Sequence, residues 1–432
     1  MAKFIVRRFF LMLLTMILVS MAVFLITQIS PGNVARNVLG SFVTAEQEAS
    51  FLNQQGLDEP LVLRYLYWLV GNDWVASHKV DMPLVRLQTE QGFEEWWAKN
   101  EEGQLLRWKL EGDELIALYR QQDGQVVEKV DNERWETNKD GSSSFWGVDR
   151  HNHVVLWEKG REKKAWTFVV GTGWMQKSGA PTEYIPLKKG FIRGDPGDSL
   201  RTGRPVAKSI GVRLRNSVVL AGAAFVLVMP VALVLGIIAG LKEGSLLDRC
   251  LSVPGMMFSV IPEFVTGIFL ILIMAYWLEL VPGATVFGEK APWTRPDMLI
   301  LPVLTLSLIE LGYILRITRA SMCEVMQSAY IRTAFLKGVK YWKVIAKHAV
   351  RNALIAPITV IMLHINWMLS GIVIVEVVFG YPGLGKYLLD AALYKDVNAL
   401  EAGAMVMVLV AVGSQLIADI IYTFLNPRIR YT

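Results

Sequence analysis

The feature that most constrains this 432-residue chain is a set of long apolar runs, near residues 9–30, 214–241, 253–280, 298–319, 352–378 and 402–425. Each run is long enough to cross about 30 Å of hydrocarbon as a helix that rises about 1.5 Å per residue. The first run follows Lys3, Arg7 and Arg8, as a signal peptide would. It exceeds the typical signal-peptide core of about 7 to 15 residues, and no small-residue cleavage pattern follows it. The sequence therefore predicts an all-α polytopic membrane protein with six transmembrane helices.

Positively charged residues indicate how these helices are oriented. The short segments on one side include both termini and the long loop between the fourth and fifth runs, and they are rich in Lys and Arg. The two short loops on the other side hold only Lys290, Arg295, Lys386 and Lys395. Because Lys and Arg are enriched in cytoplasmic loops, both termini are predicted to be cytoplasmic. The long segment between the first two runs is then periplasmic.

Within this outer segment, residues 73–192 differ in composition from the rest of the chain, and we call them the insert. Twenty of the 39 acidic residues lie between Asp73 and Lys189. Strand-like pieces such as QLLRWKL and HVVLWEK alternate with turn signals such as QDGQ and NKDG. We expect a small antiparallel β domain, with one helix near FEEWWAKNEE. Nine of the 14 tryptophans lie in it, and most are predicted to be core residues; a sugar-binding platform is the alternative.

Several classes of function are disfavoured by the sequence. The net charge of +5 comes without a basic stripe interleaved with aromatic residues, which argues against nucleic acid. Cys250 and Cys323 have no second Cys or His at ligand spacing, so no structural metal is expected. The stretch Gly380–Tyr387 resembles a phosphate-binding loop, but Tyr387 lacks the short hydroxyl that would coordinate magnesium. We expect no enzymatic activity and no cofactor in this chain.

Some polar side chains fall inside the predicted spans, where an acidic group at the bilayer centre costs about 2.5 to 3.5 kcal/mol. We expect them to face the helix bundle or a water-filled translocation path; they are Glu263, Glu310, His364, Asn366, Gln415 and Asp419. The alternative is hydrogen bonding between helices, which suits Asn366, Gln415 and Asp419 best. Glu310 and His364 are the stronger candidates for contact with a solute. A proton relay is disfavoured because only one of these six residues is a His and no inverted repeat is evident.

The cytoplasmic loop of residues 320–350 is too long for a simple turn. Tyr330, Thr333, Ala334 and Lys337 fall at positions i, i+3, i+4 and i+7, which predicts one face of a short amphipathic helix. Gly338 follows as a helix-ending residue. From periodicity alone, this helix is either a contact element or a cover that lies along the membrane surface.

The same loop resembles the conserved cytoplasmic loop of ABC-importer permeases, in its Arg-Thr-Ala triplet (residues 332–334) followed by Gly338. The stretches EVMQSAYIRTAFLKG and HAVRNALIAPIT resemble the dipeptide, oligopeptide and nickel permease family, in particular its first-permease branch. Further matches are ITQISPGN, QQGLDEPLVLRYLYWL, GDPGDSLRTGRPV, SVIPEFVTGIFL, IVEVVFGYPGLG and LNPRIRY. The resemblance covers most of the chain outside the insert, which is itself a departure from the family pattern.

The resemblance implies a type I ABC importer fold. Residues 1–72 would hold the first helix and the start of the outer loop, residues 73–192 the insert, and residues 193–432 a five-helix permease core. A cytoplasmic ATPase would receive the loop through Glu324, Tyr330, Arg332, Thr333, Ala334, Lys337 and Gly338. An outer gate would be bordered by the turn that contains Gly380, Pro382, Gly383 and Gly385.

The function implied is that of a permease subunit in the bacterial inner membrane, importing oligopeptides by ATP-driven alternating access. Its partners would be a second permease in a heterodimer, two subunits that bind ATP and Mg, and a periplasmic solute-binding protein. An oligosaccharide is the alternative solute, and nickel is a weaker one because the spans hold one His and no Cys cluster. A membrane-anchored receptor with a Trp-rich outer domain is the alternative from another class, but it leaves five spans unexplained.

Overall fold

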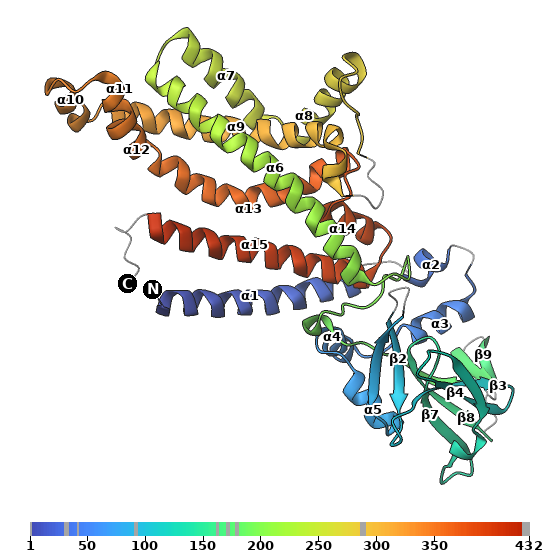
Figure 1. Ribbon diagram of the computed structural model, residues 1–432. Helices are drawn as coiled ribbons and strands as arrows, with labels where there is room; N and C mark the ends of the chain where they lie inside the picture. Colours follow the sequence, from blue (N-terminus) through green and yellow to red (C-terminus); the bar gives the residue numbers. More distant parts are fainter. Residues whose placement is uncertain are drawn as a thin grey trace. The chain divides into compact units, whose positions relative to one another are not determined.

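The computed structural model describes residues 2–29, 34–40, 43–89, 94–160, 164–169, 173–177, 181–285 and 291–425 (Figure 1). The chain divides into two units. The helical unit contains Met1–Ser20, Ser209–Asp390 and Gly403–Thr432, and the mixed unit contains Met21–Lys208 and Ala391–Ala402.

The helices of the described residues are α1 (Ala2–Ile29), α2 (Val34–Leu39), α3 (Ala45–Gln54), α4 (Leu61–Leu69), α5 (Asp73–Val80), α6 (Val206–Leu241), α7 (Leu246–Val260), α8 (Glu263–Leu270), α9 (Ile300–Met326), α10 (Ala329–Leu336), α11 (Tyr341–Val344), α12 (Val350–Ala353), α13 (Ile355–Val378), α14 (Leu384–Leu393) and α15 (Val397–Leu425). Among these residues, five helical stretches are long and apolar enough to cross a membrane: Phe9–Gln28, Val206–Leu241, Pro296–Met326, Tyr341–Met362 and Val397–Ile417. The prediction of a multi-span helical protein is thus confirmed at this coarser level.

The third predicted span, near residues 253–280, is bent. Helix α7 ends at Val260 and α8 begins at Glu263, and the two pass the membrane test together with a bend of 113° between them. Pro262 lies at this break, where its missing N–H leaves a backbone carbonyl of α7 without its helical donor. Beyond α8 the chain continues as a π-helix, Ile271–Trp277.

Helix α9 is central to the helical unit. It packs against α7 and α13, and α8 packs against both α9 and α13. Small residues allow this close approach: a Cβ atom on Gly312 of α9 would overlap the carbonyl of Gly255 on α7. Small residues have the same role at helix interfaces in membranes generally. Leu220 of α6, Ile314 of α9 and Ile372 of α13 belong to one buried core.

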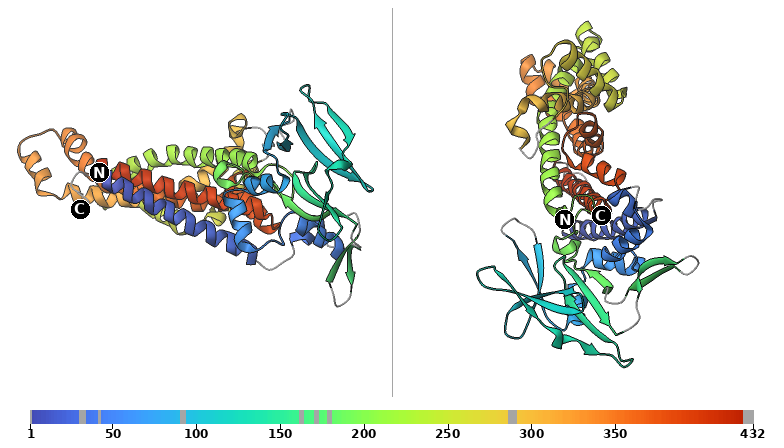
Figure 2. Two further views of the ribbon diagram at one scale, coloured as in Figure 1. Left: turned by 90° about the horizontal axis from the view of Figure 1, so that it is seen from below. Right: turned by 90° about the vertical axis from the view of Figure 1, so that its right-hand side faces the viewer.

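The strands lie in the mixed unit (Figure 2). They are β1 (Leu84–Gln88), β2 (Glu94–Lys99), β3 (Leu105–Glu111), β4 (Glu114–Arg120), β5 (Val126–Val130), β6 (Glu136–Thr137), β7 (Ser143–Val148), β8 (His153–Lys159), β9 (Lys164–Val169), β10 (Gly173–Lys177) and β11 (Pro181–Pro186). One sheet has the order β1-β2-β3-β4-β5, a second has β11-β8-β7-β6, and β9 pairs with β10. Every pair is antiparallel, so the chain contains a β-rich part, as the sequence predicted.

One expectation for the insert is wrong. The stretch FEEWWAKNEE, expected to be helical, contains β2, which pairs with β1 and β3. Both faces of β2 are covered, because Trp96 lies in the core and the guanidinium of Arg107 stacks on Trp97 at 4.5 Å. Burial on both faces of a strand outweighs the helix-forming composition of the segment.

Tryptophan side chains form much of the insert core. Trp96, Trp108 and Trp157 belong to the buried cluster, and Trp135 and Trp146 pack against it from partly buried positions. Trp74 is exposed, and the side chains of Trp166 and Trp174 lie outside the described residues. The core interpretation thus accounts for most of the described tryptophans.

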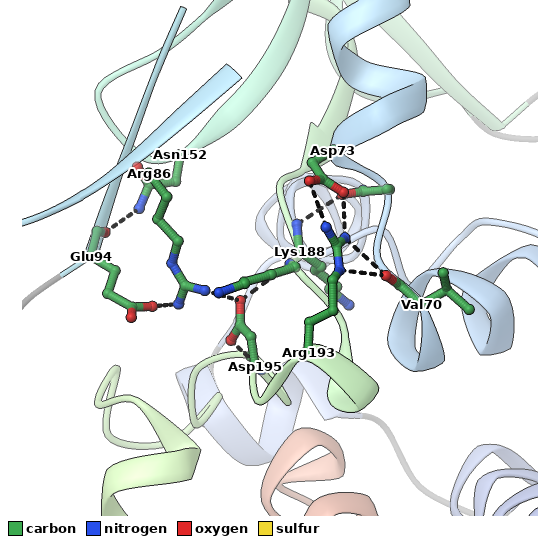
Figure 3. A network of polar contacts seen from close by, with 11 residues as sticks. Val70, Asp73, Arg86, Glu94, Asn152, Lys188, Arg193 and Asp195 are labelled. Atoms are coloured by element: carbon green, nitrogen blue, oxygen red, sulfur yellow. Dashed lines mark hydrogen bonds and ion pairs between the residues drawn. The ribbon is translucent and has the colours of Figure 1, made fainter. Parts of the chain in front are cut away.

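The two chain segments that enter and leave the strands are held together at one place (Figure 3), which we call the neck, residues 70–73 and 186–193. Asn72 donates from Nδ2 to the carbonyl of Pro186 at 2.7 Å and accepts the Lys188 N–H on Oδ1 at 2.8 Å. The Arg193 guanidinium donates to the carbonyl of Val70 at 2.9 Å and to the Asp73 carboxylate. The insert therefore begins and ends at adjacent points.

The neck generates a stability prediction. Gly71 has φ +96°, and a Cβ atom there would overlap the carbonyl oxygen of Lys189. We expect Gly71→Ala to lower the thermal midpoint of the full chain in detergent and to increase trypsin cleavage of the insert. Gly112→Ala is the matched control, because Gly112 also has positive φ, +62°, but open space around it. Equal effects of the two changes would contradict the close packing of the neck.

Candidate functional site

A cavity of about 660 Å³ lies in the helical unit, beside the bend between α7 and α8. Residues of the break, 259–263, line one side of it, and side chains of α9 and α13 line the rest. Three of the residues proposed for a translocation path meet here: Glu263, Glu310 and His364. Residues separated by about a hundred positions in the sequence are thus brought to one site.

Glu310 and His364 form a pair across α9 and α13. The His364 Nδ1 and Glu310 Oε2 atoms are 2.7 Å apart, and Glu310 is 7% exposed. The ring of Tyr313 lies 4.2 Å from the ring of His364, between centroids. The expected hydrogen bond between helices and the expected place at a cavity are therefore compatible. Glu310 and His364 bond to each other, and both residues line the cavity. Tyr313 was not singled out in the sequence, although it lies three residues beyond Glu310.

The other proposed path residues are elsewhere. Gln415 lies on α15 and is not among the described residues that line the cavity. Asn366 and Asp419 belong to α13 and α15, but their side chains lie outside the described residues. The cavity is therefore characterised by Glu263, Glu310 and His364.

The turn of residues 380–385 is fastened to α6 by a carboxylate that the sequence analysis missed, Glu376. Glu376 is 0% exposed; its Oε1 accepts from Ser217 Oγ at 2.5 Å and its Oε2 accepts the Lys386 N–H at 2.9 Å. A Cβ atom on Gly383 would overlap this carboxylate, and one on Gly385 would overlap Val373. Gly383 is thus required by its contact with the buried acid, and Gly385 by the close approach of Val373.

Neighbouring contacts complete this fastening. Asn216 of α6 donates from Nδ2 to the carbonyl of Pro382 at 2.9 Å. The backbone carbonyl of Asn216 accepts the Tyr381 hydroxyl at 2.7 Å. The Leu384 N–H donates to Ser217 Oγ at 2.8 Å. The turn is therefore a rigid link between α6, α13 and α14.

Two more buried carboxylates hold helices together. Asp248 of α7 is 3% exposed and makes a two-pronged ion pair with Arg319 of α9, at 2.5 and 2.7 Å. In the mixed unit, Glu401 is 1% exposed and accepts from Thr27 Oγ1 at 2.8 Å and from Gln28 Nε2 at 3.2 Å. The sequence marks each of these acids as a charged residue inside or beside an apolar run. It does not indicate which residue each acid pairs with.

The residues proposed to contact an ATPase lie on or beside α10. Glu324, Tyr330, Arg332, Thr333, Lys337 and Gly338 are exposed. Ala334 is partly buried against a cluster that contains Met322 and Ile331, so its methyl group packs on its own chain. Gly338 has φ +75°, as a helix-ending glycine does.

Large apolar side chains near α10 were missed by the sequence analysis. Leu336 is 81% exposed, Trp342 is 75% exposed and Tyr341 is 49% exposed. We call these three residues the α10 patch. Large apolar side chains that are exposed this close together in the sequence are typical of a surface that contacts another protein.

The comparisons with known proteins agree with this architecture. Residues 232–431 match the family model described as the binding-protein-dependent transport system inner membrane component, and residues 1–84 match the model of its N-terminal part. The chain belongs to this family of permease components. Residues 85–231, which include most of the insert, lie between the two matches.

Individual relatives point the same way. The chain is 33% identical, over 58% of its length and 80% of the relative, to a probable peptide ABC transporter permease of Sinorhizobium fredii. The oligopeptide transport system permease protein AppB of Bacillus subtilis gives the same identity and coverage. The dipeptide transport system permease protein DppB of Escherichia coli is 28% identical over 66% of this chain and 87% of its own length.

The buried acid of the turn provides the next prediction. Glu376→Ala leaves the Ser217 hydroxyl and the Lys386 N–H without their acceptor, at about 1–3 kcal/mol for each buried group. We expect a clear fall in the thermal midpoint of the purified protein, and a smaller fall for Glu376→Gln, which keeps one acceptor oxygen.

The control for this change is Asp390→Ala on the neighbouring α14. Asp390 makes only a partly exposed ion pair with Lys386 at 3.3 Å, and such pairs contribute about 0–1 kcal/mol. A fall in the midpoint for Asp390→Ala as large as that for Glu376→Ala would contradict the role given to Glu376.

Proposed function

We propose that this chain is one permease subunit of a bacterial inner-membrane importer that carries oligopeptides, with ATP hydrolysed by separate partner subunits. The observation that carries the proposal is the cavity of about 660 Å³ at a broken helix, lined by Glu263 and by the Glu310–His364 pair. Permeases named for peptides among the relatives supply the class of solute.

The volume of the cavity and the groups that line it suit a short, flexible peptide. Sites for small molecules commonly enclose about 300–1,000 Å³. Irregular backbone at membrane depth is tolerated where it lines such a cavity, and broken helices are frequent at transporter binding sites. Apolar side chains such as Leu306 and Met368 share the lining with the polar groups. A peptide, which alternates polar backbone with variable side chains, fits a mixed lining of this kind.

The proposed topology counts the bent α7–α8 pair as one span and so has six spans. Both termini and α10 are cytoplasmic, because the segments on that side carry most of the Lys and Arg residues outside the insert. The insert, residues 73–192, is then periplasmic, and residues 193–432 form the permease core. The turn of residues 380–385 lies at the outer side, where it borders the gate.

Energy reaches the permease through α10. A subunit without an ATP site of its own needs an element through which nucleotide-driven closure of its partners moves the helices. Two ATPases would bind ATP and Mg, a second permease would complete the pathway, and a periplasmic binding protein would deliver the solute. The exposed residues of α10, together with the α10 patch, form the proposed ATPase contact.

An oligosaccharide as the solute gains little support from the tryptophans. Most of the described Trp side chains in the insert are buried in its core, where their faces are not available to a sugar ring. Peptides therefore remain the proposed solute.

The proposal is tested by ATP hydrolysis in the complete complex in lipid, with the second permease, the ATPases and the binding protein. We expect di- to pentapeptides to stimulate hydrolysis and oligosaccharides to leave it at the basal rate. Stimulation by oligosaccharides instead would show that the solute is a sugar and not a peptide. An intact complex whose hydrolysis responds to neither would contradict the proposed importer function.

A second test concerns the α10 patch. Leu336→Asp places a charge on a side chain that is 81% exposed, so the fold of the chain should persist while the apolar contact with the ATPase weakens. We expect at least a several-fold loss of peptide-stimulated hydrolysis and of uptake. Leu389→Asp, at a residue 39% exposed on α14, is the control. If Leu336→Asp retains full coupling, the patch is not the ATPase contact.

A further inference from the structure

The cavity beside the broken helix contains one ionisable group that its neighbours do not satisfy. Glu310 is hydrogen bonded to His364 at 2.7 Å, so this pair is internally matched. Glu263 lines the same cavity, and no hydrogen bond or ion pair joins its carboxylate to any residue that the structure describes. A carboxylate without a partner is costly at membrane depth, which makes Glu263 the group most in need of a ligand.

The position of Glu263 directs its carboxylate into the cavity. It is the first residue of α8, immediately after Pro262, and negative charge is stabilised at the start of a helix. It reaches toward α13, where a Cβ atom on Gly371 would lie 3.7 Å from Glu263 Oε1. Gly371 has no side chain and therefore offers no side-chain donor to Glu263.

The break adds a second set of acceptors. The last helical hydrogen bond of α7 runs from the Ile261 N–H to the carbonyl of Met257. The carbonyl groups of Phe258, Ser259 and Val260 lie beyond that bond, and Pro262 has no N–H to offer. Ser259 and Val260 line the same cavity as Glu263. Glu263 and two residues with carbonyl groups beyond the last bond of α7 are therefore gathered at one end of the cavity, and carboxylate and carbonyl oxygens both accept hydrogen bonds.

We propose that this end of the cavity binds the α-ammonium group of the peptide in transit, with Glu263 as its counter-ion. An ammonium group is positively charged and has three N–H donors, which match one carboxylate and nearby carbonyls. The inference rests on the proposed import of peptides and adds the group by which they are held. Every linear peptide with a free N-terminus carries this group, whereas its side chains vary.

The rest of the lining agrees with recognition of an end group. Leu306, Ile309, Val360 and Met368 present apolar surface without further charge. Side chains of different size can pack there without a specific partner. The site would therefore discriminate between free and blocked N-termini and would discriminate little between peptide sequences.

The first experiment needs no variant. Uptake into proteoliposomes that contain the complete complex is measured for one peptide, its Nα-acetyl derivative and its C-terminal amide, each at a concentration that saturates the binding protein. We expect a kcat/KM about tenfold or more lower for the acetylated peptide, as for loss of a charge-assisted hydrogen bond, and little change for the amide. Equal uptake of the free and acetylated peptides overturns the inference.

Variants then assign the effect to Glu263. We expect Glu263→Gln to reduce uptake of the free peptide to the rate of the acetylated one, without further loss for the acetylated peptide. Glu263→Asp should keep the preference for a free N-terminus. Met368→Leu, on the same cavity, should change both peptides by the same factor. An equal loss for both peptides in Glu263→Gln would show a structural role and overturn the inference.

Failure of the proposed function would look different. In that case no peptide, free or blocked, is imported or stimulates hydrolysis by the intact complex. If peptides are imported with no regard to their N-terminus, the proposed function stands and the assignment of Glu263 falls.

Discussion

The structure depends on one requirement: an acidic group buried among apolar helices must have a partner. A buried carboxylate without one costs several kcal/mol, so each such acid determines which helices lie together. Glu376 joins α13 to α6 through Ser217, and Asp248 joins α7 to α9 through Arg319. Glu401 makes the same kind of link between α15 and α1. Apolar packing alone is non-directional, whereas these bonds specify a register for each helix pair.

The same requirement distinguishes acids that the chain itself satisfies from one that it leaves unsatisfied. Glu376, Asp248 and Glu401 are almost fully buried and have their bonds supplied by the chain itself. Glu263 lies at a cavity and has no such partner among the described residues. A group that the fold leaves unsatisfied is available to a solute. In the sequence, each of these residues is an acid within or beside an apolar run, and they look alike. Burial and hydrogen bonding in the structure distinguish the paired acids from the unpaired one.

Much of the architecture could be predicted from sequence because its signals are local. Run length predicts the spans, and periodicity with a terminal glycine predicts α10, which ends at Leu336 shortly before Gly338. The bend was not predictable in this way. Pro230 and Pro254 lie within continuous helices, whereas Pro262 lies at a break, and neighbouring helices decide which outcome occurs. The partner of Glu376 was also not predictable from the sequence, because Ser217 is 159 residues away in the chain.

The neck has a consequence for how a chain of this kind can arise. Asn72 and Lys188 are hydrogen bonded through side chain and backbone, so the path of the chain closes on itself at the base of the insert. A segment with adjacent ends can be gained or lost by a single recombination event, since the remaining chain needs only a short connection. The strands are then a module carried by a permease, and the join between Asn72 and Lys189 is a natural place to graft a reporter domain.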